Sequence, residues 1–435
     1  MTARNGSWNP FSCRRRARRR CLSEGRERSG DIALAAGQAW KGTGSGLRGM
    51  AKAVRIVQGA PGAGKSPILN EIAQNPERLR REGVPVPVVL VLKSGDIQGP
   101  LDILRPLAEK LHPSGAREFM ARTSRSTGGE AGFGLGLFRF ARRKETGIEH
   151  AELGAGWGAF GAWAERHGGF DQPVVLAVDE AQRLDHDRKH PLSKLFQGLH
   201  DGCGLPVVLV LAGLSDTEYS AGRMDLTRIP AGQVHSIGCF PDHEAVEFMA
   251  RSCAHFGIGT AGFKDEVGRL AEPCDGWPRH LHIFLTALGR EALRTGGDLG
   301  MAEWERVRTE IRTGRDGYYG YQFSAEMREA KILTARIMAG LDTGNGRGEI
   351  IRLISECRAD ASACAFPEGM DAREFFVHLV HRGALHEESV DRFVCPVPSF
   401  RTYLLDQGGI MENPSSPPGS AGGTDRPAAG NPVNA

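Results

Sequence analysis

The feature that most constrains the fold of this chain is a segment that matches the pattern Gly-x-x-x-x-Gly-Lys-[Ser/Thr]. Its residues are Gly59, Ala60, Pro61, Gly62, Ala63, Gly64, Lys65 and Ser66. The apolar run Ala53–Val57 precedes it, and a helix-like stretch through Ile68 and Ile72 follows it. Glycines let backbone N–H groups turn inward around an anion, and the start of a helix adds partial positive charge. The segment therefore predicts a phosphate-binding loop.

Two residues of this loop have roles that their chemistry indicates. Lys65 is expected to pair with the β- and γ-phosphates of a nucleoside triphosphate, which we take to be ATP, and Ser66 to place its hydroxyl on Mg²⁺. Pro67, which follows, is unusual at this place. A proline is tolerated in the first turn of a helix because the N–H that it lacks has no helical partner there. We expect Pro67 to adjust the first turn without abolishing binding.

Short apolar runs alternate with longer amphipathic stretches from residue 53 onward. The runs are Ala53–Val57, Val86–Leu92, Val174–Val178 and Val207–Leu211, with a weaker fifth at Gln233–Ile237. Runs that are apolar throughout are typical of strands buried on both faces of a parallel sheet. Stretches such as Leu101–Leu111 and Ala151–Arg166 fit the crossover helices between them. The alternation predicts an α/β fold with a parallel sheet and helices on both of its faces.

Two carboxylates, Asp179 and Glu180, end the run that begins at Val174. Asp179 is placed to hold Mg²⁺ through water, and Glu180 to polarise an attacking water as general base. Two acids after a strand are more often part of a solvated turn. Their place downstream of a phosphate loop, at a distance that suits a neighbouring strand, favours the hydrolytic role.

With these two motifs, GAPGAGKS and VVLAVDEAQ, residues 53–295 resemble the AAA+ superfamily of ATPases. Within it the chain looks like bacterial and archaeal members related to origin-recognition initiators and to transposition and secretion helper ATPases. The resemblance implies a polar sensor of the γ-phosphate after the strand Pro206–Leu211. Ser215 is the first candidate for this sensor, and Thr217 is the alternative.

The resemblance also implies two functional arginines. One reaches the ATP of a neighbouring subunit and neutralises charge in the transition state; Arg228 fits best and Arg223 is the alternative. The other, Arg279, lies in the turn Gly276–Arg279, which matches the Gly-x-Pro-Arg turn at the start of a lid helix. There it would touch the γ-phosphate as a second sensor. Exposed arginines without such roles remain the alternative for both.

Changes in composition predict five units along the chain. They are a disordered basic leader (1–49), a P-loop nucleotide-binding domain (50–239) with a variable loop at 112–150, a helical lid (240–324), a winged-helix-like domain (325–406) and a disordered tail (407–435). The Arg cluster at 14–20 leaves a nucleic-acid arm open, and Met50 leaves open that the leader is translated from a misplaced start.

The winged-helix-like prediction comes from the order helix, helix, small hairpin, helix. The second helix ends at Arg382 with Gly383 as its C′ residue, and the expected strands are Ala384–His386 and Arg392–Val397. Such a domain can bind DNA or protein. Acidic residues gather where its wing should be, which argues against strong phosphate contacts there; they are Glu387, Glu388 and Asp391.

Charge and composition narrow the class of protein. Residues 1–30 hold nine Arg and two Glu, so the net charge of +3 leaves −4 on the rest of the chain, which does not favour nucleic-acid binding. The nine cysteines show no metal or redox spacing, and the longest apolar run is far shorter than the roughly 20 residues of a membrane span. We expect a soluble, cytoplasmic protein.

Three functions fit these residues. The first is an ATPase that couples its nucleotide state to movement of the lid and the C-terminal domain, alone or as a homo-oligomer. The second is a slowly hydrolysing signalling or scaffold switch of the signal-transduction ATPase type, with a protein partner. The third is a DNA-associated helper ATPase for replication or transposition, with residues 325–406 on DNA.

Overall fold

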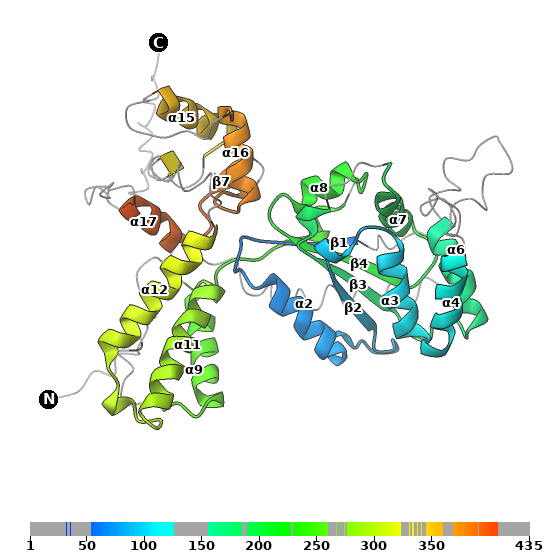
Figure 1. Ribbon diagram of the computed structural model, residues 1–435, viewed down its shortest axis with the longest axis horizontal. Helices are drawn as coiled ribbons and strands as arrows, with labels where there is room; N and C mark the ends of the chain where they lie inside the picture. Colours follow the sequence, from blue (N-terminus) through cyan, green and yellow to red (C-terminus); the bar gives the residue numbers. More distant parts are fainter. Residues whose placement is uncertain are drawn as a thin grey trace, which may run out of the picture.

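A five-stranded parallel sheet forms the centre of the predicted nucleotide-binding domain in this computed structural model (Figure 1). The structure describes residues 54–125, 155–184, 189–227, 229–259, 276–322, 345–359, 369–389 and 391–407, with single positions between them. The strands are ordered β2-β3-β4-β1-β5 across the sheet, and all four pairings are parallel. They are β1 (Val54–Gln58), β2 (Val88–Lys93), β3 (Val174–Asp179), β4 (Val207–Gly213) and β5 (Val234–Ser236).

Helices cover both faces of this sheet, as the apolar runs predict. On one face, α2 (Lys65–Gln74) packs Leu69 and Ile72 against the strands. The other face is covered by α3 (Leu101–Leu111), α4 (Pro113–Arg125), α6 (Ala155–Arg166), α7 (Pro191–His200) and α8 (Thr217–Arg223). The predicted α/β fold of the P-loop type is confirmed.

The loop expected at residues 112–150 is wrong over its first part. Helix α4 occupies Pro113–Arg125, because Phe119 packs against Phe160 and Trp163 of α6 at ring-centroid distances of 5.7 and 5.2 Å. Helix α4 has few apolar positions among many polar residues, so the sequence shows only a weak helical pattern there. The rest of the expected loop, to residue 150, lies outside the described residues.

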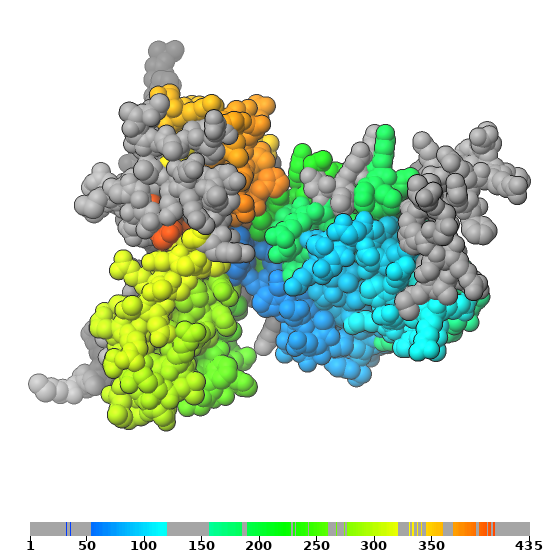
Figure 2. Space-filling model, in the orientation of Figure 1, coloured from blue at the N-terminus to red at the C-terminus, as the bar shows by residue number. Residues whose placement is uncertain are grey.

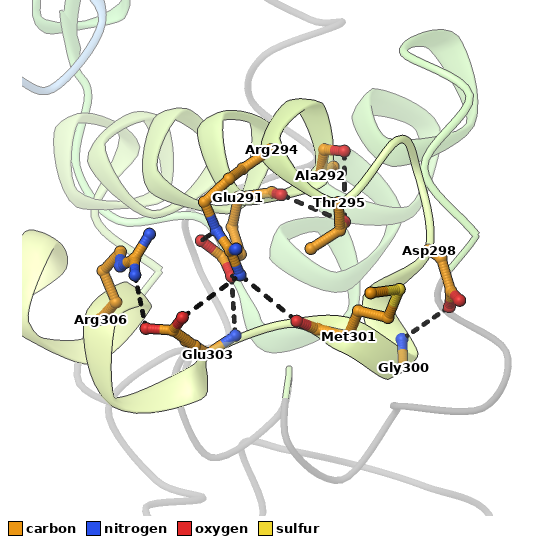
Figure 3. Close-up of polar contacts among 9 residues, drawn as sticks. All are labelled: Glu291, Ala292, Arg294, Thr295, Asp298, Gly300, Met301, Glu303 and Arg306. Carbon is orange, nitrogen blue, oxygen red and sulfur yellow. Dashed lines mark hydrogen bonds and ion pairs between the residues drawn. The ribbon is translucent and has the colours of Figure 1, made fainter.

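Three long helices lie in the region predicted as the lid, a name that we keep for them: α9 (Asp242–His255), α11 (Pro278–Arg294) and α12 (Trp304–Gln322). They enclose an apolar cluster that includes Met249, Phe284 and Val307. At the end of α11 a polar network joins the helix to the segment that leads into α12 (Figure 3). Its centre is Glu291, whose carboxylate accepts from the Arg294 guanidinium and from the backbone N–H of Glu303.

The C-terminal unit follows the predicted order of elements. It contains α15 (Arg347–Ala359), α16 (Ala372–His381), the antiparallel hairpin of β6 (His386–Ser389) and β7 (Arg392–Val394), and α17 (Pro398–Gln407). Strand β6 begins later than expected. The backbone N–H groups of Ala384 and Leu385 both donate to the carbonyl of Leu379, so these residues close the end of α16 and do not join the hairpin.

One apolar cluster links all three parts of the molecule. It contains Val57 and Ala60 beside the sheet, Trp277 and Tyr319 of the lid, and Phe376 of the C-terminal unit. Figure 2 shows the yellow lid and the orange C-terminal unit meeting the blue start of the nucleotide-binding domain. The phosphate loop therefore lies where the three parts meet.

Two further observations concern the termini and the membrane. Of the expected leader, the structure describes Ile32 and Ala35 alone; both are helical and buried in the same cluster, so these two positions differ from a disordered leader. The tail expected from residue 408 onward lies outside the described residues. No helix in the described part of the chain combines the length and apolar character of a membrane span.

Candidate functional site

The phosphate loop connects β1 to α2, as predicted, and glycine is required at several of its positions. The backbone N–H of Gly59 donates to the carbonyl of Gly213 in β4 at 3.1 Å. A Cβ atom on Gly59 would collide with the carbonyl oxygen of Ile237. Gly62 and Gly64 have φ angles of 79° and 100°, which other residues rarely adopt. Glycine at positions 59, 62 and 64 therefore permits the backbone conformation of this loop.

Lys65 turns its ammonium group back into this loop. Its Nζ atom donates to the carbonyls of Gly59 at 2.6 Å and Ala60 at 3.1 Å. Burial lowers the pKa of Lys65 to about 8, while the negative charges of Asp179 and Glu180 act in the opposite direction. The acids that follow β3 therefore lie near the lysine of the loop, as expected for one site.

The first turn of α2 leaves Ser66 and Pro67 exposed beside the loop. The first helical hydrogen bond runs from the N–H of Ile68 to the carbonyl of Gly64 at 3.2 Å. Pro67 therefore removes no hydrogen bond from the helix. It does remove one of the N–H groups that a helix N-terminus can offer to an anion.

The acids after β3 have restricted geometry. Asp179 is 8% exposed, and its Oδ1 accepts the backbone N–H of Glu180 at 3.0 Å. Glu180 has a φ angle of 56°, in the left-handed region. Residues other than glycine seldom adopt such a φ angle, and backbone strain of this kind is more frequent at functional sites. The carboxylate of Glu180 pairs with Arg183 at 2.9 Å.

The turn after β4 separates the two candidate sensors. Ser215 is half-buried, whereas Thr217 is fully buried beneath Gly213, where its hydroxyl leaves no room for a Cβ. The side chain of Gln182 accepts the backbone N–H of Leu214 at 3.2 Å and so joins the turns that follow β3 and β4. Of the two candidates, Ser215 is the more exposed. No sequence pattern indicated Gln182, although it is the last residue of the motif VVLAVDEAQ.

The predicted arginines differ in where they lie and in whether the structure describes them. Arg228 lies outside the described residues, so its role stays a prediction, and Arg223 is an exposed residue at the end of α8. Arg279 is exposed in the first turn of α11, and its Cβ lies 2.8 Å from the place that a Cβ on Gly62 would take. The start of the lid helix therefore contacts the phosphate loop at the base of the Arg279 side chain, and the role of Arg279 as a sensor stays a prediction.

Two lid residues that the sequence did not single out also contact the loop. The hydroxyl of Tyr318 in α12 donates to the carbonyl of Pro61 at 2.7 Å. The indole nitrogen of Trp277 lies 3.1 Å from the Cβ position of Gly62. These contacts join residues that are far apart in the sequence, which is why no local pattern indicates them.

The C-terminal unit reaches the same region. A Cβ on Gly383 would collide with the ring of Pro61, and Nδ1 of His381 lies 2.5 Å from Oδ2 of the buried Asp216. Burial lowers the pKa of His386 to about 4, and the charge of Lys65 adds to the shift. The unit thus contacts the phosphate loop and the turn after β4. The sequence did not indicate these contacts.

Comparisons with known proteins give structural likeness alone. No family model matches the sequence, and no curated protein matches it. Among solved structures, the Walker-type ATPase PABY2304 of Pyrococcus abyssi is 16% identical, with 86% of this chain and 94% of that chain covered and a TM-score of 0.49. The ORC2 protein of Aeropyrum pernix in its ADP form is 12% identical, with 88% and 92% covered and a TM-score of 0.49.

A further structural neighbour is the ORC1 protein of the same organism in complex with DNA. It is 14% identical, with 88% of this chain and 92% of that chain covered and a TM-score of 0.40. The fold itself rests on the strand order, the loop after β1 and the two acids after β3. On these features the chain has the fold of a P-loop nucleotide-binding protein.

Proposed function

We propose that the chain binds ATP and hydrolyses it with Mg²⁺, and that its nucleotide state sets the position of the lid and the C-terminal unit. The observation that carries this proposal is the position of Lys65. Its ammonium lies inside the glycine loop, and the charges of Asp179 and Glu180 act on it. A partly desolvated ammonium between loop carbonyls is suited to an anion, and the nearby carboxylates suit a metal and a water.

The loop supplies the binding of the phosphates. Lys65 would exchange its bonds to the loop carbonyls for the β- and γ-phosphate oxygens, and the first turn of α2 would add its free N–H groups. Arg279, whose Cβ lies against Gly62, would contact the γ-phosphate from the lid. Binding would therefore join residues of the sheet and of the lid.

The donor set at this site fits Mg²⁺. Ser66 offers a hydroxyl and Asp179 a carboxylate, and Mg²⁺ is commonly bound through one or two protein oxygens together with phosphates. Within the described ranges, no group of three or more His, Cys, Asp and Glu side chains is placed to hold a metal without a nucleotide. When bound, Mg²⁺ would neutralise charge on the phosphates.

Hydrolysis would depend on three further residues. Glu180 would polarise the attacking water, which requires its carboxylate to leave Arg183. Ser215 would sense the γ-phosphate after β4. Arg228 would stabilise transition-state charge in a neighbouring subunit of a homo-oligomer.

The slow signalling switch is a second candidate, favoured by the contacts of the C-terminal unit. Gly383 meets Pro61, and His381 meets Asp216, so the unit is held against the nucleotide site. A DNA-associated helper ATPase is less well supported, because the hairpin carries Glu387, Glu388 and Asp391, whose negative charge opposes contacts with phosphates. Asp391 accepts the backbone N–H of Arg347 at 2.9 Å, and Glu388 pairs with Arg392 at 3.3 Å.

The experiment that tests this proposal compares Glu180→Gln with wild type. We expect ATP binding to be kept and turnover to fall by about 10²- to 10⁴-fold, the range of general-base catalysis. Glu218→Gln, an exposed acid on α8, is the control and should keep full activity. Negligible turnover by the wild type, with tight binding, would reject the ATPase and favour the switch. Assays with and without DNA test the third candidate.

A further inference from the structure

We propose that Tyr318 is a positioning residue for the phosphate loop, and that with Trp277 it forms a clamp by which the lid sets the shape of the loop at Pro61 and Gly62. This inference rests on the proposed function, because its consequence is nucleotide affinity. Tyr318 lies outside the sequence motifs, and Trp277 is the variable position of the Gly276–Arg279 turn. Both side chains come from the lid, Trp277 from the residue before α11 and Tyr318 from α12.

The first observation is the hydrogen bond between Tyr318 and the loop. The phenol hydroxyl donates to the carbonyl oxygen of Pro61 at 2.7 Å, across 257 residues of sequence. The peptide bond after Pro61 is trans, so its N–H, which belongs to Gly62, points opposite to the carbonyl. By holding the carbonyl toward the lid, Tyr318 directs the Gly62 N–H away from it, where a phosphate can accept it.

The second observation is the close packing around Gly62. A Cβ there would lie 2.7 Å from the Tyr318 hydroxyl oxygen and 3.1 Å from the Trp277 indole nitrogen. The φ angle of Gly62 is 79°. Tyr318 and Trp277 therefore pack directly against Gly62, where the loop backbone turns, and leave no room for a side chain larger than the hydrogen of glycine.

The environment of Tyr318 suits a hydrogen-bond donor. Burial raises the pKa of Tyr318 to about 12, so the phenol stays protonated at neutral pH. The buried indole N–H of Trp277 acts in the opposite direction on this pKa but less strongly than burial does. The Arg279 guanidinium lies 5.8 Å from the centre of the Tyr318 ring. One side chain thus contacts both the loop and the arginine expected to read the γ-phosphate.

The neighbouring tyrosine provides a matched control. Tyr319 is also on α12 and is more deeply buried than Tyr318, but its hydroxyl contacts Ser399 Oγ of α17 at 2.8 Å and not the loop. Tyr318→Phe and Tyr319→Phe each remove one buried hydroxyl and keep the ring. Both should lower the melting temperature of the protein, so stability alone does not distinguish them.

The experiment measures nucleotide affinity and loop protection in the two full-length variants. With a fluorescent ADP analogue and with ATP, Tyr318→Phe should weaken binding about fivefold, the factor for one net hydrogen bond, with kcat within about twofold of wild type. Tyr319→Phe should bind like wild type. In the absence of nucleotide, hydrogen exchange at residues 60–64 should rise in Tyr318→Phe alone.

Each outcome decides one statement. Equal affinities and equal loop exchange in the two variants would overturn the clamp and leave nucleotide binding intact. If the wild type binds neither ATP nor ADP, the proposed function fails, and the clamp's role in nucleotide affinity fails with it. A rise in loop exchange without a loss of affinity would reject Tyr318 as a positioning residue for the nucleotide.

Discussion

The substitution Glu291→Gln in the lid tests how much one buried carboxylate stabilises this part of the molecule. Glu291 is 3% exposed and accepts from Nη2 of Arg294 at 2.6 Å, from Nε of Arg294 at 3.1 Å, and from the backbone N–H of Glu303 at 2.7 Å (Figure 3). The hydrogen bonds from Arg294 are the main cause that lowers the pKa of Glu291 to about 2. The variant removes the negative charge and keeps the shape.

The size of the effect follows from this pKa. A fall from the ordinary 4.5 to about 2 corresponds to about 3 kcal/mol of stability at neutral pH, at 1.36 kcal/mol for each unit. The network lies near the surface of the lid, and the side chain of Arg294 is 39% exposed, so solvent screens the pair. We therefore expect Glu291→Gln to lower the free energy of unfolding by about 1–2 kcal/mol.

The assay is urea unfolding of the full-length protein, followed by tryptophan fluorescence. The control is Glu305→Gln, which breaks another pair three residues apart, with Arg308, but at a side chain that is 80% exposed. It should cost less than about 0.5 kcal/mol. Because the pKa of Glu291 is lowered in the folded state, its contribution is complete above about pH 4.5 and disappears as the pH falls toward 2. Equal effects of the two variants at pH 7 would refute this reasoning.

Two predictions concern the phosphate loop. Because the pKa of Lys65 is about 8 in the free protein, nucleotide affinity should fall about tenfold between pH 7 and pH 9, and binding above pH 8 should take up a proton. Calorimetry in buffers of different ionisation enthalpy measures both quantities. An affinity that does not change with pH would contradict the lowered pKa. Pro67→Ala should tighten ATP binding a few-fold, because it restores an N–H in the first turn of α2. The control is Pro76→Ala, at the start of a surface turn. Equal ATP affinities of the two variants would show that the restored N–H does not reach a phosphate.

The nucleotide-binding domain could be predicted from the sequence because its signals are local. The glycine loop, the strand before it and the helix after it are contiguous, and the buried strands are marked by runs without polar residues. The same property explains the error at α4. Its apolar positions, Ala116 and Phe119, gain meaning only through contacts with α6, which lies about 40 residues away in the sequence.

The surroundings of the loop could not be predicted in this way. Tyr318, His381 and Gly383 show no motif, because their roles depend on contacts with residues more than 150 positions away. A tyrosine in an amphipathic helix and a histidine at a helix end have many structural uses. Only the tertiary arrangement shows that these residues converge on the phosphate loop and the turn after β4.

The contacts of Tyr318 and Gly383 with the phosphate loop meet at Pro61, and their arrangement bears on how the lid and the C-terminal unit move. The carbonyl of Pro61 accepts from Tyr318 of the lid, and its ring contacts Gly383 of the C-terminal unit. The lid and the C-terminal unit are joined to each other by buried groups: Ser399 of α17 contacts both Tyr319 and His280. Since the link between these two parts is buried, whereas their contacts with the loop are few, we expect them to move as one body when a nucleotide reshapes Pro61.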